Sequence, residues 1–393
     1  MKDSSFEKFK KTLTKKLSSD SVMSVFVVIL GFLFATLLIL FSGRNPVNLY
    51  KSILQAVTGL YQDRTGNWAW NIRYVGNWLT FSLPYILCGF SMAFAYRSGL
   101  FNIGGEGQFI AGLTAAQVFA FFAPQVPVLH WLIIILAALL AGALWGGIVG
   151  FLKARFEVSE VVATIMLNYI ALYVSRIISM GLPGANSQRT QEYPVTATLK
   201  VDFLEFLTNG SPLNLGLFLT LIAIIAYWFL IEKTNLGFSI RATGFNKEAA
   251  RASGINVTSS IVSAMAISGA FAGLAGGIIA IGSFRYGRVI SAMDGYGFAG
   301  IAVALIGNNN AAGIGFAGLL FGMLTEAQGA MQTKGIPREI TFIIQGVIVV
   351  FIALRTGFRL WIGHALNPSP KHSPNEKSQQ KADAKSDSAG VAK

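Results

Sequence analysis

Three polar side chains lie close together in a stretch of the sequence that is otherwise apolar and rich in glycine. They are Asn102, Glu106 and Gln108, within the segment NIGGEGQ. The amides could hydrogen-bond a neutral polar ligand, and the carboxyl group could do the same or carry a proton. Three of the four residues 104–107 are glycine, so we expect an interrupted helix. At membrane depth such a break is stable only when it is buried in protein or faces a water-filled cavity.

A structural role for Glu106 is equally compatible with the sequence. The residue could lie at the end of a membrane span and accept hydrogen bonds from free amides in the first turn of the next helix. Asn168 and Tyr169, in a later apolar segment, are further candidates for contact with a ligand. Hydrogen bonding between helices is the more common role of such residues, so both interpretations stay open for this set.

A second polar group forms an island between two long apolar runs, at residues 237–257. Asn246 can cap the start of a helix, and Gly254 can adopt the left-handed conformation that ends one. Glu248 in the first turn and Arg251 in the last turn suit the helix dipole. A helix of about seven residues is marginal alone and needs a surface to pack against. We therefore predict that this helix docks on another protein.

The composition is that of an integral membrane protein, since 53% of the residues are hydrophobic and only 12% are charged. The single Cys88 excludes an internal disulfide, and three scattered histidines do not suggest a metal site or a histidine-based catalytic centre. No phosphate-binding loop of the form G-x-x-x-x-G-K-[ST] occurs, and no catalytic nucleophile and base are apparent. Energy for transport would therefore come from a partner or an ion gradient.

Apolar segments of membrane-spanning length predict an all-α protein with about ten crossings. The run 295–325 is broken by three asparagines and is expected to form a short and a full crossing. Glu160 and Glu339 each head a span, and the two spans run in opposite directions, which suggests inverted repeats. The remaining predicted crossings are 22–41, 74–96, 101–123, 131–152, 160–180, 213–231, 259–283 and 339–354.

Basic residues predict the orientation of these crossings. Most of the 31 lysines and arginines fall on one side if the N-terminus is inside. Both termini and the 237–257 region are then cytoplasmic. The net charge of +13 follows from this bias, with anionic lipid contact as a secondary effect, and requires no nucleic acid partner. We expect a cytoplasmic segment 1–21, a transmembrane domain 22–364 and a disordered cytoplasmic tail 365–393.

Glycines four residues apart predict close packing between helices, because small residues let helix backbones approach in lipid. We assign them to packing within one subunit rather than to a dimer face. They are Gly142, Gly146 and Gly150, then Gly269, Gly273 and Gly277, and finally Gly318 and Gly322.

Four motifs, in order, resemble the permease subunits of bacterial ABC importers. The similarity is to the branch related to ribose and branched-chain amino acid permeases, and within it to nucleoside or simple-sugar permeases. It covers residues 74–354 and implies the type II importer fold, with about ten helices, in the plasma membrane of a bacterium. The motifs are residues 99–108 (GLFNIGGEGQ), 160–169 (EVVATIMLNY), 237–256 and 297–307 (GFAGIAVALIG).

The resemblance also implies partners. They are a cytoplasmic ATPase that binds ATP and Mg, an extracellular substrate-binding lipoprotein, and a second permease that is expected to be homologous but not identical. This chain itself would hold no cofactor. Residues 246–254 would be the coupling helix in a cleft of the ATPase. Arg241, Glu248 and Arg251 would belong to this coupling surface.

The segment 102–108 resembles the nucleoside group, because sugar permeases of this branch usually have a sequence of the Asp-Leu-Ser type there. A neutral nucleoside needs amide and hydroxyl partners, which Asn102, Gln108, Asn168 and Tyr169 provide. ATP-driven nucleoside import is therefore the leading hypothesis, with these residues and Glu106 along the substrate pathway.

Two alternatives are kept. One is a permease for ribose or another simple sugar. The other is a proton-coupled secondary transporter that uses Glu106, Glu326 or Glu339. The second alternative leaves the capped helix at 246–254 without a role.

Overall fold

The computed structural model describes residues 20–63 and 65–366. The chain divides into two units, one of which is Phe26–Ala353 and the other Met1–Val25 with Leu354–Lys393. The described part of the second unit consists of residues 20–25 of α2 (Asp20–Phe41), Leu354 and all of α16 (Arg355–Leu366). The predicted segments 1–21 and 365–393 lie outside the described residues, except at their inner ends.

The described residues include six helices that are long and apolar enough to cross a membrane, which confirms the all-α membrane class. Shorter or less apolar helices occupy the other predicted crossings: α5 (Gly105–Phe122), α13 (Tyr296–Ile306), α14 (Ala311–Thr333) and α15 (Glu339–Ala353). The six are α2, α4 (Arg73–Arg97), α6 (Leu129–Phe156), α7 (Glu160–Met180), α9 (Gly216–Lys233) and α12 (Val257–Ile278), which continues as a π-helical turn over Ile279–Ser283.

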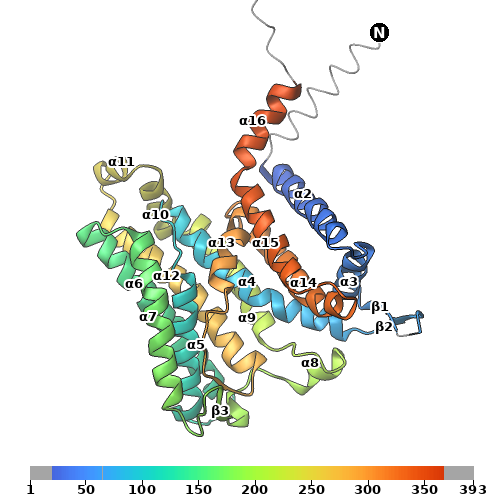
Figure 1. Cartoon of the computed structure of the whole chain (residues 1–393). Helices are drawn as coiled ribbons and strands as arrows, with labels where there is room; N and C mark the ends of the chain where they lie inside the picture. Colours follow the sequence, from blue (N-terminus) through green and yellow to red (C-terminus); the bar gives the residue numbers. More distant parts are fainter. Residues whose placement is uncertain (1–19, 64, 367–393) are drawn as a thin grey trace, which may run out of the picture. The chain divides into compact units, whose positions relative to one another are not determined.

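Helices α4 and α12 form the centre of the larger unit (Figure 1). Within the 18-residue apolar stretch of each of these two helices, 83% of the residues are buried, compared with 28% for α7 and for α9. Helix α12 packs against α6 through facing glycines, and a Cβ added at Gly142 would lie 2.7 Å from the Gly273 Cα. Gly318 and Gly322 of α14 pack closely against Ile86 and Ser82 of α4. The assignment of these glycines to packing within the subunit is confirmed.

The predicted division of the run 295–325 is also confirmed. Helix α13 ends at Ile306, and the next residues include Asn308 and Asn309 with φ of 51° and 53°. Asn310 then caps α14 by accepting a hydrogen bond from the Ala312 amide at 3.0 Å. With 11 residues, α13 is about 16 Å long, roughly half the thickness of the hydrocarbon core.

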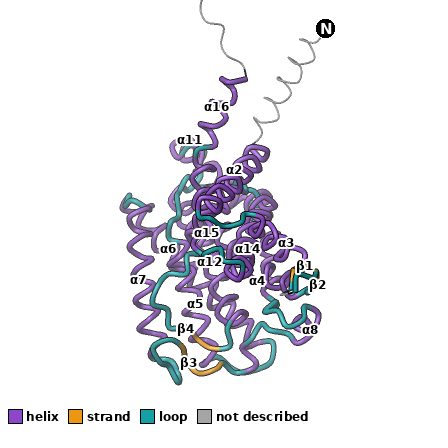
Figure 2. Tube along the Cα trace, turned by 45° about the vertical axis from the view of Figure 1, so that its right-hand side comes forward, coloured by secondary structure: helices purple, strands orange, loops and turns teal. Residues whose placement is uncertain are grey.

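Two segments between the predicted crossings, residues 42–73 and 181–212, contain regular structure of their own. The first holds α3 (Val47–Thr58) and a hairpin of β1 (Leu60–Gln62) with β2 (Trp68–Trp70). The second holds β3 (Arg189–Glu192), a 3₁₀ turn at Val195–Ala197 and α8 (Asp202–Leu207), and β3 pairs with β4 (Tyr286–Arg288). Figure 2 shows β3 and β4 at the end of the larger unit opposite to α11 (Lys247–Ala252), so the polar island and the β3–β4 pair lie far apart.

Candidate functional site

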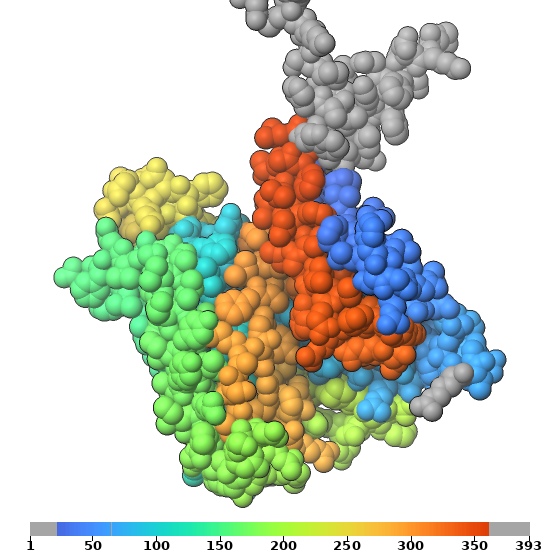
Figure 3. Space-filling view, viewed as in Figure 1, coloured from blue at the N-terminus to red at the C-terminus, as the bar shows by residue number. Residues whose placement is uncertain are grey.

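The polar island forms two consecutive helices, α10 (Asn235–Phe245) and α11. Asn246 Oδ1 accepts hydrogen bonds from the Glu248 and Ala249 amides, both at 3.0 Å, and Gly254 has a φ of 80°. Both predicted ends of the short helix are therefore confirmed. In the space-filling view this segment, drawn in yellow, stands at the surface (Figure 3).

The charged side chains of α11 face solvent and each other. Arg251 Nη1 and Glu248 Oε2 are 3.0 Å apart, and the two side chains are 65% and 78% exposed. On the opposite side of the helix, Ala250 is buried in an apolar cluster that includes Leu100 and Ile261. The packing of Ala250 stabilises a helix that is too short to persist alone and leaves its charged face free.

Helix α10 is joined to the turn between α4 and α5. Arg241 forms an ion pair with Glu232, whose other carboxylate oxygen lies 3.7 Å from the Arg97 guanidinium. Next to this cluster, the backbones of Gly244 and Gly99 are in contact, and a Cβ at Gly244 would lie 3.0 Å from the Gly99 amide nitrogen. Arg241, predicted as part of the coupling surface, thus has its partner within the chain.

The predicted break is present between α4 and α5, but it ends before Glu106, so the prediction that Gly105 and Gly107 also interrupt the helix is wrong. Helix α5 begins at Gly105, and the irregular segment lies just before it, at residues 98–104. Close packing explains two glycines of this contact. A Cβ on Gly107 would lie 2.9 Å from the Asn168 Cα, and one on Gly297 would lie 2.5 Å from the Glu106 Cα. In contrast, a Cβ on Gly105 would make an ordinary contact of 3.5 Å with the Gly297 Cα.

Glu106 caps a helix that is distant in the sequence. Its Oε1 accepts a hydrogen bond from the Gly295 amide and its Oε2 from the Gly297 amide, both at 2.7 Å. The side chain is fully buried. These amides belong to the first turn of α13, where acceptors are otherwise missing. A capping role is therefore present, although the capped helix is α13 and not a helix adjacent in the sequence.

The other end of α13 is held as well. Arg97 Nη2 and Tyr227 Oη both donate to the Asn309 carbonyl oxygen, at 3.0 and 2.8 Å. Arg97 therefore contacts both the Glu232–Arg241 pair and the turn that follows α13. The cluster at the end of α10 and the two ends of α13 form one connected network.

Asn102 and Gln108 are buried and bind each other. Asn102 Nδ2 donates to Gln108 Oε1 at 2.9 Å and to Ser268 Oγ at 2.7 Å, and Ser91 Oγ lies 3.1 Å from Ser268 Oγ. The two serines were not predicted as site residues, because single serines within apolar runs have no distinctive spacing. In this conformation the four side chains join α4, α5 and α12.

Asn168 and Tyr169 are neighbours in the sequence with opposite environments. Asn168 Oδ1 accepts from the Gly107 amide at 2.7 Å, and its Nδ2 donates to the Ile103 carbonyl at 3.1 Å. It therefore attaches α7 to the start of α5. Tyr169 points outward and is 53% exposed.

The other carboxyl groups considered for proton transport differ in environment. Glu326 accepts a hydrogen bond from Asn77 Nδ2 at 3.1 Å. Glu339 is exposed and pairs with its neighbour Arg338 at 3.2 Å. Among the residues with described positions, no cluster of three His, Cys, Asp or Glu side chains is suited to a metal ion.

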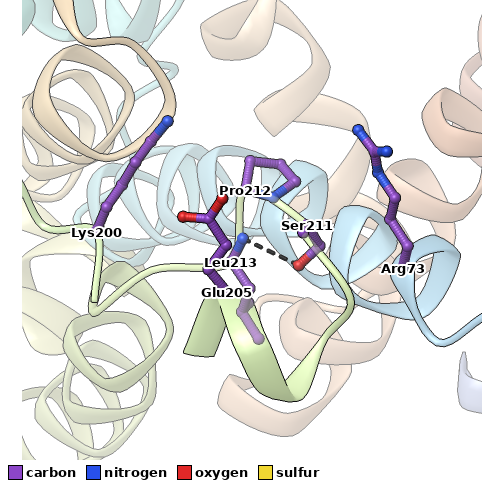
Figure 4. Close-up of a pocket in the computed structure, with 7 residues that line it drawn as sticks. Arg73, Lys200, Glu205, Ser211, Pro212 and Leu213 are labelled. Atoms are coloured by element: carbon purple, nitrogen blue, oxygen red, sulfur yellow. Dashed lines mark hydrogen bonds between the residues drawn. The ribbon is translucent and has the colours of Figure 1, made fainter. Parts of the chain in front are cut away.

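A hollow of about 210 Å³ lies where the start of α4 meets the turn after α8. Figure 4 shows Arg73 and Lys200 on opposite sides of this hollow, with Glu205 between them. Burial, and then the nearby Arg285, lowers the pKa of Lys200. No spacing in the sequence connects these three residues, and they were not predicted as a group.

The family of the chain follows from its match, over residues 74–353, to a model described as branched-chain amino acid transport system / permease component. The chain belongs to this family of ABC transporter permeases. It is thus a transport subunit rather than an enzyme, and permeases of this kind work with an ATPase and a substrate-binding protein.

Three relatives illustrate the similarity. The guanosine ABC transporter permease protein NupP of Bacillus subtilis is 39% identical over 89% of this chain and 98% of its own length. The nucleoside ABC transporter permease protein NupB of Lactococcus lactis is 33% identical over 85% of this chain and 91% of its own. The glucose ABC transporter permease protein TsgB13 of Haloferax volcanii is 31% identical over 71% and 75%. No solved structure shows significant similarity.

Proposed function

We propose that this chain is the permease of an ATP-driven nucleoside importer in the plasma membrane of a bacterium. The relatives named for guanosine and nucleosides align over more of this chain, and at higher identity, than the glucose permease. This difference favours a nucleoside over ribose or another sugar. The proposal includes about ten crossings of type II topology, cytoplasmic termini, a homologous but non-identical second permease and an extracellular binding lipoprotein.

The observation that supports coupling to an ATPase is the form of α11. It is capped by Asn246, ends at Gly254, packs through Ala250 and exposes Glu248 and Arg251. A short helix with one anchored side and one charged free side is suited to a cleft of a second protein. In this proposal the partner ATPase binds ATP and Mg, and α11 follows its motion.

The contacts of α10 give this motion a route into the membrane domain. A displacement of α11 moves α10, which contacts the α4–α5 turn directly through Gly244. Arg241 of α10 also pairs with Glu232 of α9, which in turn lies next to Arg97. Arg97 holds the end of α13, while Glu106 at the start of α5 holds its beginning. Helices α5 and α13 would therefore move together with α10, and this movement would open the pathway alternately to the two sides.

Reversing both charges of α11 tests the docking surface. In the double variant Glu248→Arg with Arg251→Glu, the two side chains can still pair, so the helix itself is retained. With all partners in proteoliposomes, we expect guanosine uptake and co-purification of the ATPase to fall about tenfold, the equivalent of ~1.4 kcal/mol. The matched control is Arg189→Glu with Glu192→Arg, two exposed residues of β3 at the opposite end, for which ATPase co-purification should not change. Undiminished uptake in the α11 variant would contradict the docking role.

Removing the charge of Arg97 tests the route. Arg97→Gln loses the interaction with Glu232 and weakens the hold on Asn309, so we expect ATP hydrolysis to continue while guanosine uptake per ATP falls about fivefold, or ~1 kcal/mol. Arg97→Lys, which keeps the positive charge, should restore part of the ratio of guanosine uptake to ATP hydrolysis. Arg155→Gln, on the exposed last turn of α6, is the control. A normal transport ratio in Arg97→Gln would exclude this residue from coupling.

A further inference from the structure

Helix α7 lies at the edge of the larger unit (Figure 2). The side chains on its outward face are unusual for a membrane span. Its buried side includes Thr164, Asn168 and Ser175, which contact the rest of the subunit. Its outward side includes Tyr169 at 53% and Tyr173 at 61% exposure, and Arg176 is exposed as well. The outward side of this helix is therefore not purely apolar.

These three residues form one stripe that runs from the middle of the helix toward its C-terminal end. They are four and three positions apart, a spacing that places side chains on the same face. Tyr169 is about 14 Å along α7, near the middle of its 21 residues. Within the described residues, neither tyrosine hydroxyl nor the Arg176 guanidinium has a hydrogen-bond or ion-pair partner. The stripe thus presents unpaired polar groups at membrane depth.

The outward faces of α6 and α9 serve as a comparison, because their composition is typical of helix faces that contact lipid. The exposed residues of α6 between positions 132 and 144 and of α9 between positions 218 and 229 are apolar. They are Leu132, Leu136, Leu140 and Leu144 on α6, and Phe218, Leu221, Ile222, Ile225, Trp228 and Phe229 on α9. An unpaired hydroxyl in hydrocarbon is costly, and an arginine is more costly. Lipid is therefore a poor environment for the α7 stripe.

Close packing against another helix is also disfavoured. Helix interfaces in membranes are rich in small residues, which allow the backbones to approach. The outward side of α7 instead has large side chains at each turn, including Val162, Met166 and Ile177. A water-filled space would solvate the two hydroxyls and the guanidinium, which neither lipid nor a closely packed helix does.

We propose that Tyr169, Tyr173 and Arg176 line the translocation pathway and that the two tyrosine rings stack on the base of a passing nucleoside. The choice of ligand rests on the proposed function. A flat base stacks well on phenol rings, and the hydroxyls and the guanidinium can hydrogen-bond its edge or the ribose. Because Asn168 attaches α7 to α5, the stripe also moves with the network that contains Glu106.

Accessibility to water tests the location. Cys88 is the single cysteine of this chain and is buried, so Cys88→Ala gives a permease chain without thiols, on which the labelling is measured. In that background, Tyr169→Cys, Tyr173→Cys and Arg176→Cys are treated with a charged thiosulfonate in proteoliposomes that contain the complete transporter. Leu140→Cys and Ile225→Cys are the lipid-facing controls. We expect the three stripe variants to react about tenfold faster, because reaction requires a hydrated thiolate, and added guanosine should slow them. Rates equal to those of the controls would overturn the proposal.

Uptake kinetics test the stacking. Tyr169→Phe retains the ring and should keep a KM for guanosine within about twofold, whereas Tyr169→Leu should raise it about tenfold. Phe218→Leu on α9 is the control. An unchanged KM in Tyr169→Leu would contradict stacking. The labelling experiment needs no nucleoside, so the two hypotheses can fail separately. Fast labelling without guanosine uptake would contradict only the proposed substrate class. Normal guanosine uptake with slow labelling would contradict only the location of the stripe in the pathway.

Discussion

Glu106→Ala is expected to lower the free energy of unfolding by about 2–6 kcal/mol and to abolish uptake. The substitution leaves the Gly295 and Gly297 amides buried without an acceptor, at about 1–3 kcal/mol each. It also releases the start of α13 from α5. Thermal unfolding in detergent, followed together with guanosine uptake in proteoliposomes, measures both effects.

Two further variants separate capping from a proton-carrying role. Glu106→Gln keeps one oxygen for one amide but places an NH₂ group against the other, so stability and uptake should fall together. A carboxyl group that carried a proton would lose uptake in this variant with little change in Tm. Glu192→Ala, an exposed residue of β3, is the control. A Tm for Glu106→Ala equal to that of the control would rule out the capping role.

Gly273→Val is expected to prevent accumulation of folded permease. A Cβ on Gly273 would lie 2.9 Å from the Gly142 Cα and would collide with the Ala138 carbonyl, so the backbones of α12 and α6 would have to separate. Backbone cannot change rotamer to make room, and we expect a cost above about 3 kcal/mol. Size-exclusion chromatography of a fluorescent fusion measures the folded yield.

Gly147→Ala is the matched control for this packing prediction. Gly147 lies on α6 beside the glycine series, and its added Cβ would meet only the Ala266 Cβ, at 3.7 Å. This variant should accumulate normally. A normal yield of Gly273→Val would show that the two helices tolerate separation.

Features that depend on neighbours in the sequence could be predicted. Asn246 and Gly254 define α11 because capping involves residues only a few positions apart. The break after Ile306 was visible for the same reason, since consecutive asparagines favour left-handed backbone. The spacing of the glycines predicted that α6 and α12 each pack closely against another helix. It did not predict that these two helices pack against each other.

Features that depend on distant residues could not be predicted. The sequence indicates that Glu106 needs donors but does not indicate that they are the amides of Gly295 and Gly297. The glycines at 105 and 107 were interpreted as helix breakers because their contacts, Gly297 and Asn168, lie far along the chain. Helix α3 was missed because its 12 residues are amphipathic and too short for a span.

The contact between Gly244 and Gly99 has a consequence for stiffness. Most helices touch through side chains, whose rotamers can change and so absorb part of a small movement. Here two backbones meet directly, with Gly99 at a φ of 77°. No side chain lies between them to yield. A shift of α10 toward the turn therefore reaches the α4–α5 turn almost undamped, and even alanine at position 244 would act as a wedge.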